Sequence, residues 1–159
     1  MEKRVKLEKV RLEKRIGGLH FVIELPRTAT KTEAVEARHL AVMERFIMSK
    51  LCECGKPSKD GFKFLRTRSR IKAVDLARLI DVTPETISRW EREDDKNEVP
   101  GSAWELVVTV AEEYLKGKTD TLDRLRQRHE RREHPPARLS MSESVFIRLL
   151  RDSMPSLRV

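Results

Sequence analysis

The segment from Thr83 to Arg92 carries polar side chains that can read the edges of nucleic-acid bases. A guanidinium such as that of Arg89 can donate two hydrogen bonds to O6 and N7 of guanine, and the carboxylate of Glu85 can accept one from the amino group of cytosine. The candidate base-contacting residues are Thr83, Glu85, Thr86, Ser88, Arg89 and Arg92. The competing interpretation of the same residues is a solvated helix surface without a ligand.

A short helix that begins at Pro84 is needed to present these side chains. Thr83 can accept hydrogen bonds from the free N–H groups of the first turn. Pro84 suits the first helical position because it lacks the N–H group that would otherwise stay unsatisfied. Ile87 and Trp90 recur at helical spacing and are expected to face inward, which directs the polar side chains outward.

A second helix is predicted immediately before this one. Leu76, Ile80 and Val82 can fill a small core between the two helices. Ala77 supplies the small side chain that a close helix crossing requires. Residues 71–91 therefore predict a helix-turn-helix, a motif whose second helix enters the major groove of DNA.

The composition favours a polyanionic partner. The chain has 159 residues with 34 Lys and Arg against 26 Asp and Glu, a formal net charge of +8. Such a charge binds phosphates by releasing counterions, although a membrane surface would also attract it. Only 38% of the residues are hydrophobic, so one modest core with long solvated segments is expected.

The location is predicted to be cytoplasmic. Two cysteines, Cys52 and Cys54, are too few for a secreted disulfide scaffold, and their spacing disfavours a mutual disulfide. Residues 1–15 are highly charged and do not resemble a secretory signal. No uncharged apolar run reaches about 18 residues, so no membrane span is expected.

The region before residue 58 predicts a β-hairpin followed by a helix. Gly17 and Gly18 separate two apolar runs and can supply the positive φ angles of a tight turn. A helix over residues 2–16 is a rival, because Leu, Lys, Glu and Arg favour helices. An amphipathic helix is predicted over residues 33–50, and residues 52–60 are expected to connect it to the next domain.

The rest of the chain predicts four or five helices and a tail. Residues 59–118 are expected to form the DNA-binding domain, and its last helix should begin around residues 100–102. One face of that helix carries Trp104, Val107, Val108 and Ala111, which suit a dimer surface and the domain core equally well. Residues 119–159 are expected to form a tail in which the segment from Arg124 to Arg138 is rich in arginine. A short helix is predicted over residues 142–151 of this tail.

Three stretches carry a resemblance to a known family: Phe64-Leu65-Arg66, Asp75-Leu76-Ala77, and residues 82–91, which read Val-Thr-Pro-Glu-Thr-Ile-Ser-Arg-Trp-Glu. They make the chain similar to the Cro/cI-type (XRE) helix-turn-helix family, and more closely to the C-terminal domain of MqsA-type antitoxins. The resemblance implies a mainly α fold with a bundle of four to five helices. It also implies a structural ion pair between Arg66 and Glu91.

The chain departs from the family pattern at several positions. The Cys-x-x-Cys zinc ligands of the antitoxins are absent, and the formal set of His20, His39, Cys52 and Cys54 matches no usual site, so no metal is expected. Two phosphate-contacting positions are replaced by Lys72 and Ala73, and Lys72 remains a candidate contact to phosphate. Asp81 stands where the family usually has Gly and tolerates a left-handed backbone. Lys96, after the acidic residues 93–95, is a second candidate phosphate contact.

The function expected from the sequence is that of a sequence-specific DNA-binding transcriptional regulator, acting as a homodimer that represses its own operon. The alternative is the antitoxin of a toxin–antitoxin pair, in which residues 1–58 bind and neutralise a toxin protein. A third alternative is an interaction module that does not bind DNA. No catalytic constellation or phosphate loop is recognisable, so neither an enzyme nor a cofactor is expected.

Overall fold

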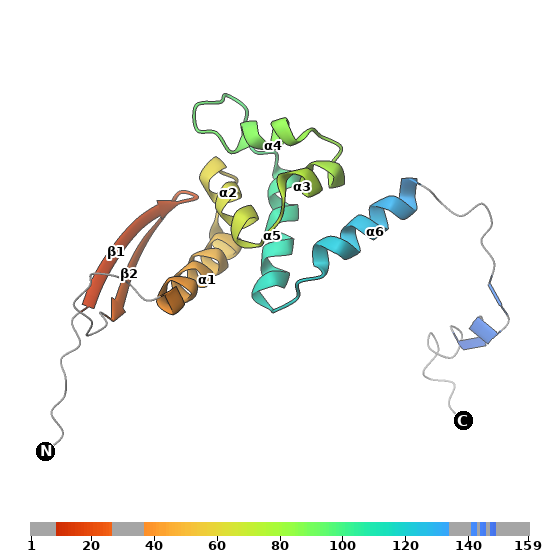
Figure 1. Ribbon diagram of the computed structural model, residues 1–159, viewed down its shortest axis with the longest axis horizontal. Coiled ribbons are helices and arrows are strands. Elements are labelled where there is room, and N and C mark those ends of the chain that lie inside the picture. Colours follow the sequence, from red (N-terminus) through yellow and green to blue (C-terminus); the bar gives the residue numbers. More distant parts are fainter. Residues whose placement is uncertain (1–8, 27–36, 134–140, 143, 146, 149–159) are drawn as a thin grey trace, which may run out of the picture. The chain divides into compact units, whose positions relative to one another are not determined.

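The computed structural model describes residues 9–26, 37–133, 141–142, 144–145 and 147–148. The chain divides into one unit up to Arg126 and a second unit from Gln127. The described part of the first unit holds a two-stranded β-hairpin, five helices and the first residues of a sixth (Figure 1). The fold is therefore mainly helical with a small antiparallel hairpin before the helices, as the sequence predicted.

The hairpin consists of β1 (Lys9–Ile16) and β2 (Leu19–Pro26). The strands are antiparallel, and Ile16 lies opposite Leu19 beside the turn. Gly17 and Gly18 form this turn with φ angles of 63° and 74°, which most other residues avoid. The hairpin prediction is confirmed, and the rival helix is wrong for residues 9–16, because the glycines reverse the chain there.

Helix α1 spans Ala37–Cys54, and residues 33–36 of the expected helix lie outside the described residues. The helix buries Ile47, Met48 and Leu51. It continues past the expected end at residue 50, and the N–H of Gly55 still bonds to the carbonyl of Leu51 at 2.9 Å. The expectation of a connection over residues 52–60 is therefore corrected, because Cys52 and Cys54 belong to the last turn of α1.

Four helices follow: α2 (Lys59–Arg68), α3 (Ala73–Leu79), α4 (Pro84–Trp90) and α5 (Gly101–Leu115). Ser58 caps the first of them, since its hydroxyl accepts a hydrogen bond from the N–H of Gly61 at 3.2 Å. Pro100 precedes the last, as expected from its fixed φ. Residues 59–118 thus contain four helices, within the predicted range.

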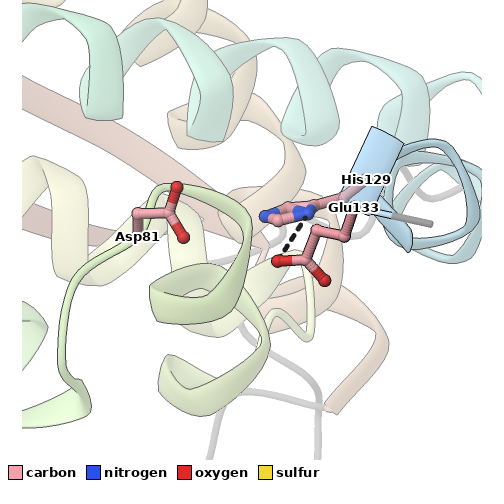
Figure 2. Close-up of side chains that lie close together, drawn as sticks. All are labelled: Asp81, His129 and Glu133. Atoms are coloured by element: carbon pink, nitrogen blue, oxygen red, sulfur yellow. Dashed lines mark ion pairs between the residues drawn. The ribbon is translucent and has the colours of Figure 1, made fainter. Parts of the chain in front are cut away.

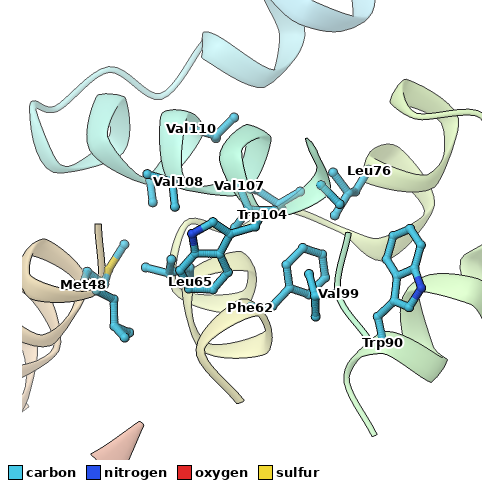
Figure 3. Close-up of a cluster of buried hydrophobic side chains, with 14 of the residues drawn as sticks. Met48, Phe62, Leu65, Leu76, Trp90, Val99, Trp104, Val107, Val108 and Val110 are labelled. Atoms are coloured by element: carbon cyan, nitrogen blue, oxygen red, sulfur yellow. The ribbon is translucent and has the colours of Figure 1, made fainter. Parts of the chain in front are cut away.

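Helix α5 packs against α1 and α2 and supplies much of the core (Figures 1 and 3). Figure 3 shows Trp104 amid buried side chains of the other helices. The α5 residues that the sequence offered as a dimer surface are all buried inside this chain: Trp104 is 3% exposed, Val107 0%, Val108 8% and Ala111 0%. The dimer-surface interpretation is therefore wrong, because these side chains are already covered by the chain's own core.

The core also includes the hairpin. Ile16 and Phe21 are buried in the same cluster as Phe62 and Trp104, and the Phe21 and Phe46 rings meet edge to face with their centroids 6.3 Å apart. The boundary expected at residue 58 is thus not marked by any break in the core. Residues of the hairpin and α1 instead pack in the same core as the helices that follow.

Helix α6 (Thr121–Glu133) lies in the first part of the segment expected as an Arg-rich tail. Within the first unit, Thr121 is buried, and Leu122 and Leu125 pack against the core. In the second unit, His129 Nδ1 and Glu133 Oε1 are 3.6 Å apart; Figure 2 draws this pair and also Asp81, which belongs to the first unit. Of the short helix expected over residues 142–151, the described residues 144–145 and 147–148 are helical.

Among the described residues, no helix combines the length and the apolar character needed to cross a bilayer.

Candidate nucleic-acid interface

Helix α4 presents the expected polar residues on its outward side. Its inward residues are Ile87, which is fully buried, and Trp90, which is 9% exposed. Thr83, Glu85, Ser88, Arg89 and Arg92 are exposed, and Thr86 is half-buried. Positions 85, 88 and 89 follow the spacing of one helix face, so the structure brings these three candidates together on a single surface. Arg92 lies two residues past the end of the helix, where its N–H bonds to the carbonyl of Arg89 at 3.2 Å.

The start of α4 is fixed by the residues that the sequence indicated. The hydroxyl of Thr83 accepts a hydrogen bond from the N–H of Thr86 at 3.2 Å, and Pro84 occupies the first helical position. The backbone N–H of Glu85, the Thr83 hydroxyl and the nearby Arg89 cation lower the pKa of the Glu85 carboxyl. Glu85 is therefore ionised at neutral pH and can act only as an acceptor.

The crossing of α3 and α4 depends on Ala77 and Asp81. Ala77 is 1% exposed, and its carbonyl accepts a hydrogen bond from the N–H of Val82 at 3.0 Å. Between them Asp81 adopts a φ of 52°, the left-handed conformation that the sequence predicted at this position. The turn joins two packed helices, and Leu76 of α3 and Ile87 of α4 both lie in the buried core.

Helix α2 holds the end of α4 through Arg66. The Nε of Arg66 bonds to Oε1 of Glu91, and its Nη2 donates to Oε2 at 3.0 Å. The third donor, Nη1, reaches the carbonyl of Ile71 at 2.7 Å. The ion pair implied by the resemblance is present, and the same guanidinium also fixes the chain just before α3. Both side chains are largely withdrawn from water, with 13% and 10% exposed.

Lys59 forms a second link between α2 and the segment after α4. Its ammonium group donates to the carbonyl of Arg92 at 3.1 Å and to the carbonyl of Asp95. The sequence interpretation missed this role. The available signal is that Lys59 lies seven residues before Arg66 and so shares its face of α2.

Arg92 is exposed but already engaged. Its Nε and Nη2 atoms bond to the two carboxylate oxygens of Asp94 at 3.1 and 2.7 Å, and these bonds lower the pKa of Asp94. Arg92 therefore differs from Arg89 as a candidate contact to DNA. To bind a ligand, Arg92 would first have to give up its hydrogen bonds to Asp94.

The two candidate phosphate contacts are both exposed. Lys72 stands at the residue before α3 and makes no side-chain cap there. Lys96 lies in the segment between α4 and α5, beyond the acidic residues 93–95. Asp95 in that segment accepts hydrogen bonds from the backbone N–H and the side chain of Asn97, both at 2.8 Å, which lower its pKa.

The formal metal-ligand set is not assembled in the described part of the chain. His20 lies on β2 and His39 at the start of α1, whereas Cys52 and Cys54 lie at its end. Both cysteines are free thiols. Burial, reinforced by the nearby carboxylates of Glu112 and Glu53, raises the pKa of Cys52 to about 11, so this thiol stays protonated at neutral pH.

Comparison with known protein-family models, with curated protein sequences and with solved structures finds no match for this chain.

Proposed function

We propose that this protein is a sequence-specific DNA-binding transcriptional regulator. Helices α3 and α4 would act as a helix-turn-helix of the Cro/cI type, with α4 in the major groove. The observation that carries the proposal is the outward face of α4, where Glu85, Ser88 and Arg89 project from a capped helix whose two ends are fixed. The formal charge of +8 supports the same partner.

Arg89 is the principal base-reading residue in this proposal. Its side chain is exposed at the middle of the outward face, and no carboxylate among the described residues forms an ion pair with it. A guanidinium in the major groove recognises guanine through two hydrogen bonds, which typically discriminates against the wrong base by about 1–3 kcal/mol. Glu85, ionised by the contacts around the cap, would accept a hydrogen bond from a cytosine amino group.

Backbone contacts would set the position of α4 on the duplex. Lys72 before α3 and Lys96 after α4 are exposed cations that flank the reading helix in the sequence, and both suit contacts to phosphates. Arg92 would join them by leaving Asp94. This exchange makes part of the binding free energy depend on the strength of an internal ion pair.

The regulator is proposed to act as a homodimer on its own operator. A single reading helix contacts few base pairs, and two copies reading half-sites roughly 34 Å apart are the usual solution. Since Trp104 and its neighbours on α5 fill the core, the dimer contact must lie elsewhere on the chain.

A second candidate function is neutralisation of a toxin protein by residues 1–58. Exposed apolar side chains on β2 and α1 favour a protein partner for this region: Val22 is 47% exposed, Val42 66% and Phe46 48%. Co-expression with a neighbouring small gene product would test it. A stable complex that Phe46→Ser abolishes is the expected result, and its absence would leave DNA regulation as the only proposal.

The test of the leading function is binding to DNA from upstream of the protein's own gene, in the presence of excess random competitor. Wild type, Arg89→Ala and Lys116→Gln should be compared at two salt concentrations. Lys116 is exposed at the end of α5 and serves as a control for loss of one positive charge. Specific binding that is lost only in Arg89→Ala supports the proposal, and binding without preference in wild type would refute it.

A further inference from the structure

A groove of about 560 Å³ adjoins the end of α4. One wall is the end of β1, the floor is the outer face of α2, and the other wall is the segment that follows α4, from Glu91 to Asp94. No residue of this groove except Arg92 was a DNA-contact candidate from sequence.

The wall and floor toward the hairpin are basic. Lys14 of β1 and Arg68 of α2 lie near the ring of Phe64, with the Lys14 Nζ 5.5 Å and the Arg68 Cζ 5.7 Å from its centroid. Lys63 and Arg15 line the same side and are exposed. Arg68 is paired with Glu44 at 2.9 Å. By contrast, no described carboxylate pairs with Lys14, Arg15 or Lys63.

Most of the acidic groups in the groove are already engaged. Glu91 is bound by both prongs of Arg66, and Asp94 by Arg92. The carboxylate of Asp60 accepts hydrogen bonds from the N–H groups of Gly17 at 3.0 Å and Gly61 at 2.8 Å. Glu93 is left as one exposed acid beside three cations that form no ion pair with any described carboxylate, so an anionic ligand fits the hairpin side of the groove better than a cationic one.

The groove is continuous with the face of α4 that is proposed to read DNA. Arg92 connects the two, because it lies just past the end of α4, with its N–H bonded to the carbonyl of Arg89 at 3.2 Å, and also lines the groove. The hairpin is held rigidly at this place. A Cβ atom on Gly17 would overlap the side chain of Leu51, and the Gly17 N–H is bound to Asp60 at the start of α2. Its basic residues therefore keep a fixed position relative to α2.

We infer that this groove is a second nucleic-acid site, which binds the sugar–phosphate backbone of the duplex read by α4. Lys14, Arg15 and Lys63 contact the phosphates that flank the half-site, so the hairpin works as part of the DNA-binding surface. This inference rests on the proposed function. It assigns the hairpin a role in affinity and not in sequence choice, because phosphates carry no sequence information directly.

The test is the salt dependence of DNA binding by the full chain carrying Lys14→Gln together with Lys63→Gln. Glutamine retains much of the aliphatic stem that covers Phe64 while removing the charge. Each lost phosphate contact is expected to reduce the slope of log K against log salt by about one unit. Operator and random DNA should lose affinity by the same factor. Lys50→Gln together with Lys116→Gln is the matched control, since both lysines lie outside the groove and the two pairs of changes alter net charge equally.

The outcomes separate the inference from the proposed function. A slope reduced by about two units in the groove variant and unchanged in the control supports the inference. If wild type binds its operator through Arg89 and the groove variant has the wild-type slope, the inference is overturned and the proposed function stands. Absence of DNA binding by wild type overturns both. A change in operator preference in the groove variant would also contradict the inference, because such a change would mean that the groove reads bases.

Discussion

Arg66 and Glu91 form a two-pronged ion pair that fastens the end of α4 to α2. The pair joins residues 25 positions apart in the sequence, and the remaining donor of Arg66 holds the carbonyl of Ile71 ahead of α3. One guanidinium thus fixes both ends of the α3–α4 segment. The orientation of the outward face of α4 is consequently set by a contact on its opposite side.

Glu91→Gln is expected to destabilise the fold. It leaves the guanidinium of Arg66 facing a neutral group in a site where only 13% of the Arg66 side chain is exposed. Removing one partner of such a pair should lower the free energy of unfolding by about 2–4 kcal/mol, measured by urea denaturation. Asp94→Asn is the control, because it breaks an exposed pair with Arg92 and should change stability little. Equal effects of the two substitutions would contradict the structural role.

Ala77→Leu is expected to overpack the crossing of α3 and α4. Ala77 is 1% exposed, and three additional carbons can be accommodated only by moving the helices apart. The cost should be about 1–3 kcal/mol in the free energy of unfolding. Val74→Leu on the same helix is the control, since Val74 is 53% exposed. A melting temperature unaltered by Ala77→Leu would mean that the two helices do not cross at this residue.

Asp81→Val should destabilise the turn by at least about 1 kcal/mol relative to Asp81→Gly. The φ of 52° is strained for a β-branched side chain and unstrained for glycine. Both substitutions remove the carboxylate, so their difference isolates the backbone conformation. Thermal denaturation of the pair measures it, and equal stabilities would indicate that residue 81 is not left-handed in solution.

The sequence predicted local features of the fold better than contacts between distant residues. The glycine turn at residue 17 and the cap at Thr83 depend on neighbouring residues, and both appear where predicted. The Arg66–Glu91 pair was expected only from a resemblance, and the Lys59 contacts were not expected at all. Such contacts depend on how α2 packs against the rest of the chain, which no local pattern encodes.

The apolar stripe of α5 shows that helical spacing can identify a covered face but not what covers it. The spacing of Trp104, Val107 and Ala111 indicates that one helix face is covered, but it cannot distinguish a second copy of the chain from the chain's own core. Phe62 and Leu65 of α2 and residues of α1 provide the cover here. Similarly, the end of α1 was misplaced because Cys52 and Cys54 have no strong helical preference, and packing extended the helix over them.

Cys52 should be alkylated much more slowly than Cys54 in the folded protein at pH 8. Burial raises the pKa of Cys52 to about 11, so only about 0.1% of it is thiolate at this pH, and its side chain is partly covered. Cys54 is exposed. Iodoacetamide labelling followed by peptide mass spectrometry gives the two rates, and unfolding in urea should bring them together. Equal rates in the folded protein would contradict the burial of Cys52 at the end of α1.

Base reading by Arg89 is best tested by selecting binding sites from random duplexes with wild type and Arg89→Ala in parallel. Wild type is expected to enrich one motif containing guanine, and Arg89→Ala is expected to lose the preference for that guanine while retaining the rest of the motif. Affinity for the selected site should fall by about 1–3 kcal/mol. An unselective wild type, or an identical motif from the two proteins, would contradict the assignment of α4 as the reading helix.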